Sequence, residues 1–424
     1  MPIIRQFFFL VLLFSFIYPV IWNFFPIAFS RIMGVLGFVY VIVYVKSNYV
    51  TKQYRNIVIG YALVAMVTLI QTLFTDAFDL EFLKKIIFVP LLNYFGALFL
   101  YLIVSKEEHT FGRLCDYILT VAMIQAIISF AMFITPGLSD SVFALIDYDQ
   151  KVEELHESLT YRLTGIGQAY WGAGINYGMD LLILTLLPDI KGSYIYEHKF
   201  LYWPITAIVI LAGIFSARTF FISFIFVALY FVLMRKNVFS TIVNSYKYIL
   251  IIPIFLFLYQ YLGSNLGERF DRVESHAFEL FNNYEESGEL ESSSTNTLRS
   301  MYDILPTETK TWIIGDGHFR NADGSYYMHT DIGYFRQIFF YGLIGLFVYI
   351  MVVIYVYRRC YHQYTNPAIK IFLIVMMLFE LTLNLKALIT LTTYLGLFLA
   401  WGIMNRNKEH ETLINRELIN YMIK

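Results

Sequence analysis

Long apolar runs, separated by short polar connections, occupy most of the chain. An α-helix needs about 20 predominantly apolar residues to cross a bilayer, and twelve runs are of that order. They cover about Gln6–Trp22, Pro26–Val45, Asn56–Phe74, Ile86–Val104, Leu114–Ile134, Gly174–Leu187, Phe200–Phe215, Thr219–Met234, Tyr246–Leu262, Ile332–Tyr357, Ala368–Leu385 and Ala387–Met404. We therefore predict an all-α fold: a polytopic transmembrane helical bundle of about 12 helices, forming a single integral membrane domain over residues 1–424.

The first run resembles a signal peptide in following a basic residue, Arg5. It has no small-residue cleavage site and a second apolar run follows almost at once, so we predict a retained first helix. Composition agrees with a membrane protein, since 58% of the residues are hydrophobic, 15% are charged and the mean hydropathy is +0.60. Lipid is the expected main solvent of such a chain.

The distribution of Lys and Arg predicts the orientation, because short cytoplasmic connections carry an excess of both. With the N-terminus inside, thirteen basic residues fall in the cytoplasmic connections and four in the short outer turns. The thirteen are Lys46, Lys52, Arg55, Lys106, Arg113, Lys191, Lys199, Arg235, Lys236, Lys247, Arg358, Arg359 and Lys370, and the four are Lys84, Lys85, Arg218 and Lys386. Both termini are then cytoplasmic, and residues 135–173 and 263–331 form two outer loops.

The larger outer loop, between predicted helices 9 and 10, contains most of the polar sequence. Between Ser264 and Thr330 there are twelve acidic and five basic residues, and the first half is typical of a solvated surface. The second half combines apolar and turn-forming residues in 312–318 and ends in 328–331, directly before a long apolar run. Cys115 and Cys360 lie at predicted cytoplasmic helix ends, so we expect no disulfide in this loop.

The motifs of nucleotide-dependent and hydrolytic enzymes are missing from the sequence. There is no Walker loop, no Rossmann glycine fingerprint, no zinc-spaced Cys/His set and no nucleophile elbow, which argues against ATP-driven transport. Asp147 and Asp149 could together hold a divalent cation. Because Glu153 and Glu154 follow, an acidic surface loop is the favoured interpretation, and we predict no metal site and no cofactor.

Arginine side chains at the predicted outer face are the strongest chemical signal. Arg218 stands in a short turn between two apolar runs, where it either extends its head group to water or holds an anion. Four further arginines fall on the same side, namely Arg31, Arg162, Arg299 and Arg336. The planar guanidinium donates two parallel hydrogen bonds to phosphate oxygens, so this set suits a diphosphate headgroup.

His329 lies just before the helix predicted after the larger loop. We expect Asp331 to cap that helix, and Arg336, seven residues beyond His329, to share a face with it two turns on. A base and an anion-binding group would then point into one cleft. The alternative is a partly solvated histidine at the membrane interface.

Four polar residues lie on or near predicted helices: Asp180, Glu380, Asn384 and Lys386. They either line an acceptor cavity or form hydrogen bonds between helices. The sequence leaves both interpretations open.

Six short motifs, in this order along the whole chain, resemble the O-antigen polymerase (Wzy-type) and O-antigen ligase superfamily of bacterial envelope enzymes. They are Arg162-Leu163-Thr164-Gly165, Ser216-Ala217-Arg218-Thr219, Asn296 with Arg299, Gly315-Asp316-Gly317, His329-Thr330-Asp331 and Gly342-Leu343-Ile344-Gly345. The chain departs from the family where Ala217 separates Ser216 from Arg218. Ligases tend to have Asn after the histidine, so Thr330 favours a polymerase.

The resemblance implies a glycosyltransferase of the bacterial inner membrane that acts at the periplasmic face. A growing glycan would move from undecaprenyl diphosphate to the next lipid-linked repeat unit, by direct metal-independent displacement. His329 would be the catalytic base, the diphosphate would bind Arg218, Arg299, Arg336 and Arg162, and Asp331, Gly315 and Gly317 would support the site.

The expected partners are the lipid-linked oligosaccharide, membrane lipid and a chain-length regulator protein, with no nucleic acid. Three alternatives stay open: a ligase that uses a lipid A core acceptor, a transporter of the lipid-linked glycan, and a structural subunit.

Overall fold

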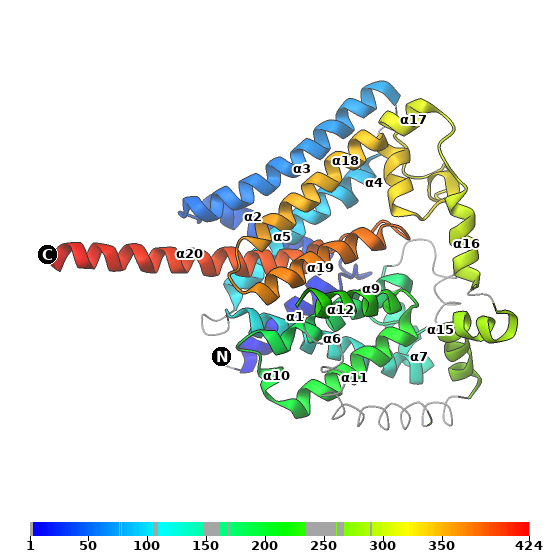
Figure 1. Cartoon of the computed structure of the whole chain (residues 1–424), viewed down its shortest axis with the longest axis horizontal. Helices are drawn as coiled ribbons and strands as arrows, with labels where there is room; N and C mark the ends of the chain where they lie inside the picture. The colour runs from blue at the N-terminus through cyan, green and yellow to red at the C-terminus, as the bar shows by residue number, and fades with distance from the viewer. Residues whose placement is uncertain are drawn as a thin grey trace. The chain divides into compact units, whose positions relative to one another are not determined.

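The computed structural model describes residues 3–75, 77, 79–104, 109–147, 162–167, 170–234, 260, 267–288 and 291–423. Within these ranges the fold is all-α, and β-structure is limited to isolated bridges such as Trp22 with Ile146. The predicted class is thus confirmed (Figure 1). The chain divides into two compact units: residues 1–29, 110–292 and 366–376 form unit 1, and residues 30–109, 293–365 and 377–424 form unit 2.

Unit 1 is built mainly on four apolar helices, α6, α9, α11 and α12, which pack on one another, with α1 beside α6. Its elements are α1 (Ile3–Ile17), α6 (Phe111–Ile134), α7 (Pro136–Phe143), α9 (Tyr170–Leu186), η3 (Leu187–Asp189), α10 (Tyr194–Glu197), α11 (Lys199–Ser216), α12 (Phe220–Leu233), α15 (Glu268–Ser287) and the first part of α19 (Pro367–Leu383).

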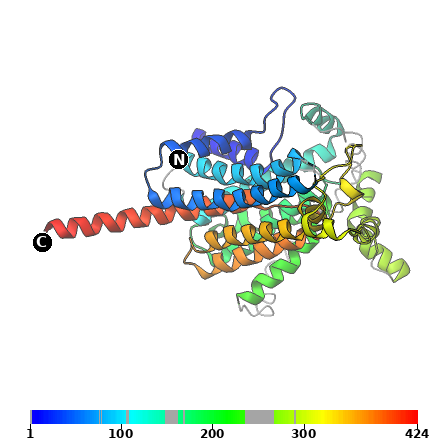
Figure 2. The same cartoon turned by 90° about the horizontal axis from the view of Figure 1, so that it is seen from above.

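Unit 2 contains α3 and α18 side by side, and α5 packed against α20 (Figures 1 and 2). Its elements are α2 (Phe29–Val43), α3 (Asn48–Thr75), α4 (Leu80–Leu83), η1 (Lys84–Phe88), α5 (Val89–Ile103), α16 (Ser293–Tyr302), α17 (Thr309–Ile314), η5 (Tyr327–His329), α18 (Gly333–Tyr361), the rest of α19, and α20 (Thr392–Ile423).

Five helical segments of the described chain are long and apolar enough to cross a membrane, which indicates a multi-pass membrane protein. They are Asn48–Thr75, Leu80–Ile103, Phe111–Ile134, Lys199–Ser216 and Gly333–Tyr361, and three shorter apolar helices are Ile4–Ile17, Phe29–Val43 and Phe220–Leu233. Eleven of the twelve predicted runs coincide at least in part with helices, whereas the run predicted at 246–262 lies almost wholly outside the described residues. The count of twelve crossings stays a prediction.

Contacts join segments that were predicted to lie on the same side of the membrane. Among outer segments of unit 1, the amide of Leu163 donates to the carbonyl of Phe215 at 2.9 Å. Among inner segments of unit 2, the side-chain amide of Asn405 donates to the carbonyl of His109 at 2.7 Å. This is the pattern expected when successive helices cross in alternate directions. The outer ends are those that the distribution of Lys and Arg predicts to lie outside the cytoplasm.

Two helix boundaries differ from the sequence prediction for physical reasons. Helix α3 begins at Asn48, eight residues before the predicted start at Asn56. The polar residues of its first two turns are helical although they precede the apolar run. The last helix begins at Thr392 rather than Ala387. Asn384 holds the residues before it in a turn, since its side-chain amide donates to the carbonyl of Ile389 at 2.8 Å and its side-chain oxygen accepts from the Ile389 amide at 3.4 Å.

A glycine kink in α18 anchors the loop that contains His329. Gly342 has φ 69° inside the helix, so the carbonyls of Phe339 and Phe340 lose their usual helical partners. The amide of Asp316 donates instead to Phe339 at 2.6 Å, and the amide of Gly317 to Phe340 at 3.0 Å. A side chain at Gly342 would collide with the carbonyl of Ile313. The kink thus satisfies buried backbone groups across two elements of unit 2.

We predict that Gly342→Ala lowers the stability of the protein by at least about 1–3 kcal/mol, the usual cost of a non-glycine residue held in a disfavoured backbone region. Loss of the α17–α18 contact adds to this cost. Thermal unfolding of the purified protein in detergent measures the effect. Gly172→Ala is the control, because a side chain there meets open space. Equal unfolding temperatures for Gly342→Ala and the wild type would contradict this account.

Candidate functional site

Arg218 lies in the three-residue turn between α11 and α12, at the outer end of unit 1. Its side chain is only 8% exposed, and Nη1 donates to Oε2 of Glu279 at 2.5 Å. The guanidinium therefore does not simply extend into water, as a residue anchored at a membrane interface would. It is held in an ion pair by a helix that follows 50 residues later in the chain.

That helix, α15, was expected to be solvated surface, but the structure shows it docked on unit 1. Phe270, Val273 and Ala277 are buried at helical spacing, and the Phe270 ring meets Phe215 of α11 edge-on at 5.7 Å. The correction follows from amphipathicity: α15 contains six acidic residues, but its apolar residues recur at helical spacing and form a stripe. Docking this stripe fixes the position of Glu279, which was not predicted as a site residue.

A histidine of α15 connects the second predicted arginine to the same carboxylate. Nε of Arg162 lies 3.0 Å from Nε2 of His276, and Nδ1 of His276 lies 3.9 Å from Oε2 of Glu279. Because a guanidinium can only donate, Nε2 accepts, so the imidazole is neutral with its proton on Nδ1. The four side chains form a chain of contacts, Arg162–His276–Glu279–Arg218, which we call the arginine cluster.

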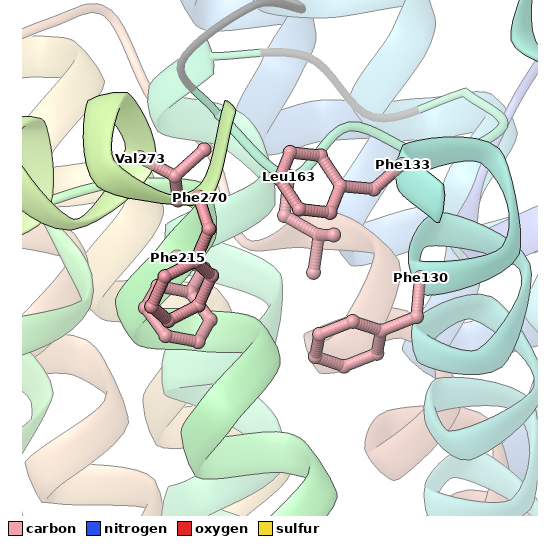
Figure 3. A pocket seen from close by; sticks show the side chains of 6 residues that line it. All are labelled: Phe130, Phe133, Leu163, Phe215, Phe270 and Val273. Carbon is pink, nitrogen blue, oxygen red and sulfur yellow. The ribbon is translucent and has the colours of Figure 1, made fainter. Parts of the chain in front are cut away.

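Figure 3 shows an apolar recess in unit 1, to which α6 contributes together with segments that also hold the arginine cluster. It is lined by Phe130, Phe133, Leu163, Phe215, Phe270 and Val273. Leu163 follows Arg162 in sequence, Phe215 precedes Arg218 by three residues, and Val273 precedes His276 by three. Positive charge beside apolar surface suits a ligand that has an anionic head and an apolar chain.

The remaining predicted site residues lie in unit 2, around the loop of residues 315–332. Arg336, in the first turn of α18, is 8% exposed, and its guanidinium carbon lies 3.6 Å from the ring centre of Tyr326 and 4.2 Å from that of Phe319. No hydrogen-bond acceptor reaches its Nε or Nη2 in the structure. These two nitrogens form the edge that binds a carboxylate or phosphate with two hydrogen bonds, so the residue is suited to an anion.

His329 has a strained backbone at the exposed end of this loop. Its φ is 53° and that of Met328 is 57°, a left-handed conformation that is uncommon for residues other than glycine. The amide of His329 donates to the carbonyl of Tyr326 at 2.8 Å. Such strain persists only where surrounding contacts impose it, and it clusters at functional sites.

Ser325 sets the protonation pattern of His329. Its hydroxyl donates to Oδ1 of Asp323 at 2.6 Å and accepts from the side-chain amide of Asn321 at 2.9 Å. Its one proton is thus engaged, so at 3.3 Å from Nδ1 of His329 it can only accept. In the neutral imidazole this contact favours the tautomer with the proton on Nδ1, which leaves the lone pair on Nε2. Hydrogen bonds from the Ser325 hydroxyl and amide also lower the pKa of Asp323.

An ion pair attaches this loop to the short helix α4. Nε and Nη2 of Arg320 donate to the two carboxylate oxygens of Glu81 at 2.5 and 2.9 Å. The amide of Phe319 donates to Asp79 at 3.2 Å. Sequence reasoning did not find this contact, because nothing in either segment alone indicates the pairing.

Of the residues predicted to support the site, the two glycines lie at a backbone contact, whereas Asp331 does not have its predicted role. Gly315 and Gly317 lie at the α17–α18 contact described above. Asp331 does not cap α18: Ile332 occupies that position without a side-chain hydrogen bond, because the helix begins at Gly333. Arg299 lies exposed in the last turn of α16. The structure thus brings Arg162 and Arg218 to one cluster in unit 1. His329 and Arg336 both lie in unit 2, but the prediction that they share a helical face is wrong, because α18 begins only at Gly333 and the backbone of His329 is left-handed.

The buried polar residues fall into two groups. Glu380 accepts from the hydroxyl of Tyr357 at 2.6 Å, which together with the turn at Asn384 favours the interpretation of hydrogen bonding within the bundle. Asp180, on α9, is fully buried and neither carboxylate oxygen has a hydrogen-bond partner in the structure.

The proposed Asp147–Asp149 pair is described only at Asp147, which is exposed, whereas Asp149, Glu153 and Glu154 lie outside the described residues. The described part of the chain contains no group of three His, Cys, Asp or Glu side chains that could hold a metal ion. Cys115 and Cys360 are buried free thiols.

Comparison with known proteins gave no match to any protein-family model, curated protein or solved structure. Functional inference therefore depends on the geometry of this chain and on its short motifs.

Proposed function

We propose that this protein is a polymerase of O-antigen or a related surface polysaccharide, which transfers a growing glycan from undecaprenyl diphosphate to the next lipid-linked repeat unit. The observation that supports this most is the arginine cluster beside the apolar recess in unit 1. A polyprenyl diphosphate has the same two parts, an anionic head and an apolar chain. Arg162 and Arg218 would bind the head, and the apolar side chains that line the recess would contact the start of the chain.

The donor brings its own leaving group, which suits a chain without a nucleotide-binding motif. The acceptor hydroxyl attacks the anomeric carbon, the bond from that carbon to the diphosphate oxygen breaks, and undecaprenyl diphosphate leaves. Nε2 of His329 takes the hydroxyl proton as general base. Within unit 1, Arg218 with Arg162 is suited to stabilise the charge that develops on a leaving diphosphate, and within unit 2, Arg336 and Arg299 are further anion-binding groups. Direct displacement inverts the anomeric configuration and needs no metal.

This function places the chain in the bacterial inner membrane with about twelve crossings, both termini in the cytoplasm, and the chemistry at the periplasmic face. The charge distribution and the same-side contacts within each unit support the arrangement. A chain-length regulator protein is the expected protein partner.

A ligase would use the same donor but a lipid A core acceptor. The gel pattern of lipopolysaccharide or capsule from a deletion strain separates the two: one repeat unit on the core indicates a missing polymerase, and bare core a missing ligase. The threonine after His329 favours the polymerase.

One observation favours a second candidate function, a transporter of the lipid-linked glycan. Asp180 is a buried carboxylate without a hydrogen-bond partner, and ionisable residues within membrane helices often mark ion or proton pathways. Purified protein in liposomes tests this directly. A transporter moves the lipid-linked glycan between leaflets without forming a glycosidic bond.

We predict that His329→Ala reduces polymer formation by about 10²- to 10⁴-fold, the usual contribution of a general base, with unchanged abundance in the membrane. Ser325→Ala should give a smaller loss, because it removes the group that fixes the His329 tautomer. The length ladder of the polysaccharide is the measurement. His318→Ala, which changes another exposed histidine of the same loop, is the control. A wild-type ladder from His329→Ala would exclude the catalytic role.

Arg218→Lys should retain part of the activity with weaker donor binding, because lysine keeps the charge and loses the planar fork. Arg218→Ala should lose nearly all of it, since two charge-assisted hydrogen bonds of roughly 1.5 to 3 kcal/mol each are removed. Polymer yield and donor affinity are measured together. Arg272→Ala, an exposed arginine of α15 in a surface pair, is the control. Normal polymer and normal affinity in Arg218→Ala would make Arg218 an interfacial anchor only.

A further inference from the structure

Glu279 occupies the position that the proposed ligand needs. Its Oε2 accepts from Nη1 of Arg218 at 2.5 Å, and the Arg218 side chain is largely enclosed. A phosphate oxygen that approaches through Nη1 would need the donor that Glu279 already uses. Carboxylate and phosphate oxygens therefore compete for one site, and in this structure the carboxylate fills it.

The charges of the cluster make simultaneous binding unfavourable. With His276 neutral, two guanidinium groups and one carboxylate leave a single net positive charge. A diphosphate next to Glu279 would put like charges within a few ångströms of each other, which disfavours the presence of both anions at Arg218 at the same time. When Glu279 leaves, Nη1 of Arg218 becomes available to the incoming anion.

The position of Glu279 on α15 allows it to leave. The buried residues of the helix, Phe270, Val273 and Ala277, come before it, while Asn282, Tyr284 and Glu285 after it are exposed. Glu279 itself is 23% exposed, at the border between the docked and the solvated part. A side-chain rotation, or a shift of the solvated part of α15, releases Arg218 without undocking the apolar stripe.

We propose that Glu279 is an internal ligand of Arg218, which occupies the anion site in this structure and is displaced by a diphosphate headgroup. The inference rests on the proposed function. A tethered carboxylate competes at an effective concentration in the millimolar range, so weakly charged or neutral lipids do not replace it. Glu279 thereby makes the site selective for ligands of higher negative charge.

Binding of inorganic pyrophosphate to the purified full-length chain in detergent, by isothermal titration calorimetry, tests the proposal. Glu279→Gln keeps the shape of the side chain and removes the charge, and we expect its Kd to be about tenfold lower than that of the wild type, equivalent to about 1.4 kcal/mol. Glu268→Gln, on the same helix but 91% exposed, should bind as the wild type does. Arg218→Ala should lose binding.

Farnesyl diphosphate forms a second arm of the experiment, which separates a lipid headgroup from free pyrophosphate as the ligand. Tighter binding of farnesyl diphosphate than of pyrophosphate indicates a lipid ligand, and equal binding indicates the free anion. Glu279→Gln should tighten both by a similar factor. If this variant does not fold, Glu279→Asp replaces it, because the shorter side chain cannot reach Arg218 in the same geometry and should also lower the Kd.

Unchanged or weaker binding by the Glu279 variant would overturn the proposal, because the carboxylate would then orient Arg218 rather than compete for it. If the wild type binds and Arg218→Ala does not, unchanged or weaker binding by the Glu279 variant overturns the internal ligand alone and leaves the proposed function standing. If no form of the protein binds either diphosphate, both fail.

Discussion

The need to satisfy backbone hydrogen bonds in an apolar solvent governs this structure. A chain surrounded by lipid meets that need most simply in α-helices, where each amide finds an acceptor four residues away. The candidate site residues of unit 2 lie close to a place where this helical pattern is interrupted. At Gly342 the helix breaks, and the carbonyls of Phe339 and Phe340 take amide donors from the segment after α17. This exchange fixes the start of the loop that ends in His329.

Each unit combines a rigid element with charged side chains that are held by specific partners. In unit 1 the apolar stripe of α15 docks on the bundle and places His276 and Glu279 against two arginines. In unit 2 the guanidinium of Arg336 lies near two aromatic rings, with one hydrogen-bonding edge unsatisfied. Buried cations with incomplete partners are costly unless an anion compensates them. The arrangement around Arg336 therefore favours an anionic ligand, whereas in unit 1 the charge of Arg218 is balanced by Glu279.

The sequence predicted those features that depend on local pattern. Apolar runs located eleven helices, and the scarcity of polar loop around Arg218 singled out that arginine. Contacts across long separations could not be predicted: Arg162 and His276 are 114 residues apart, and Arg218 and Glu279 are 61 apart. The acidic composition of 268–288 also concealed the apolar stripe of α15. Asp331 was expected to cap α18, but the helix begins two residues after it.

The proposed function requires that the purified chain forms glycosidic bonds from a lipid diphosphate donor. The direct test is a defined undecaprenyl diphosphate-linked repeat unit, incubated with the purified protein in detergent or liposomes without nucleotide, followed by mass spectrometry. A polymerase should form dimers and longer glycans on the lipid, with one undecaprenyl diphosphate released for each bond formed. Folded protein that binds the substrate and returns it unchanged would contradict the account.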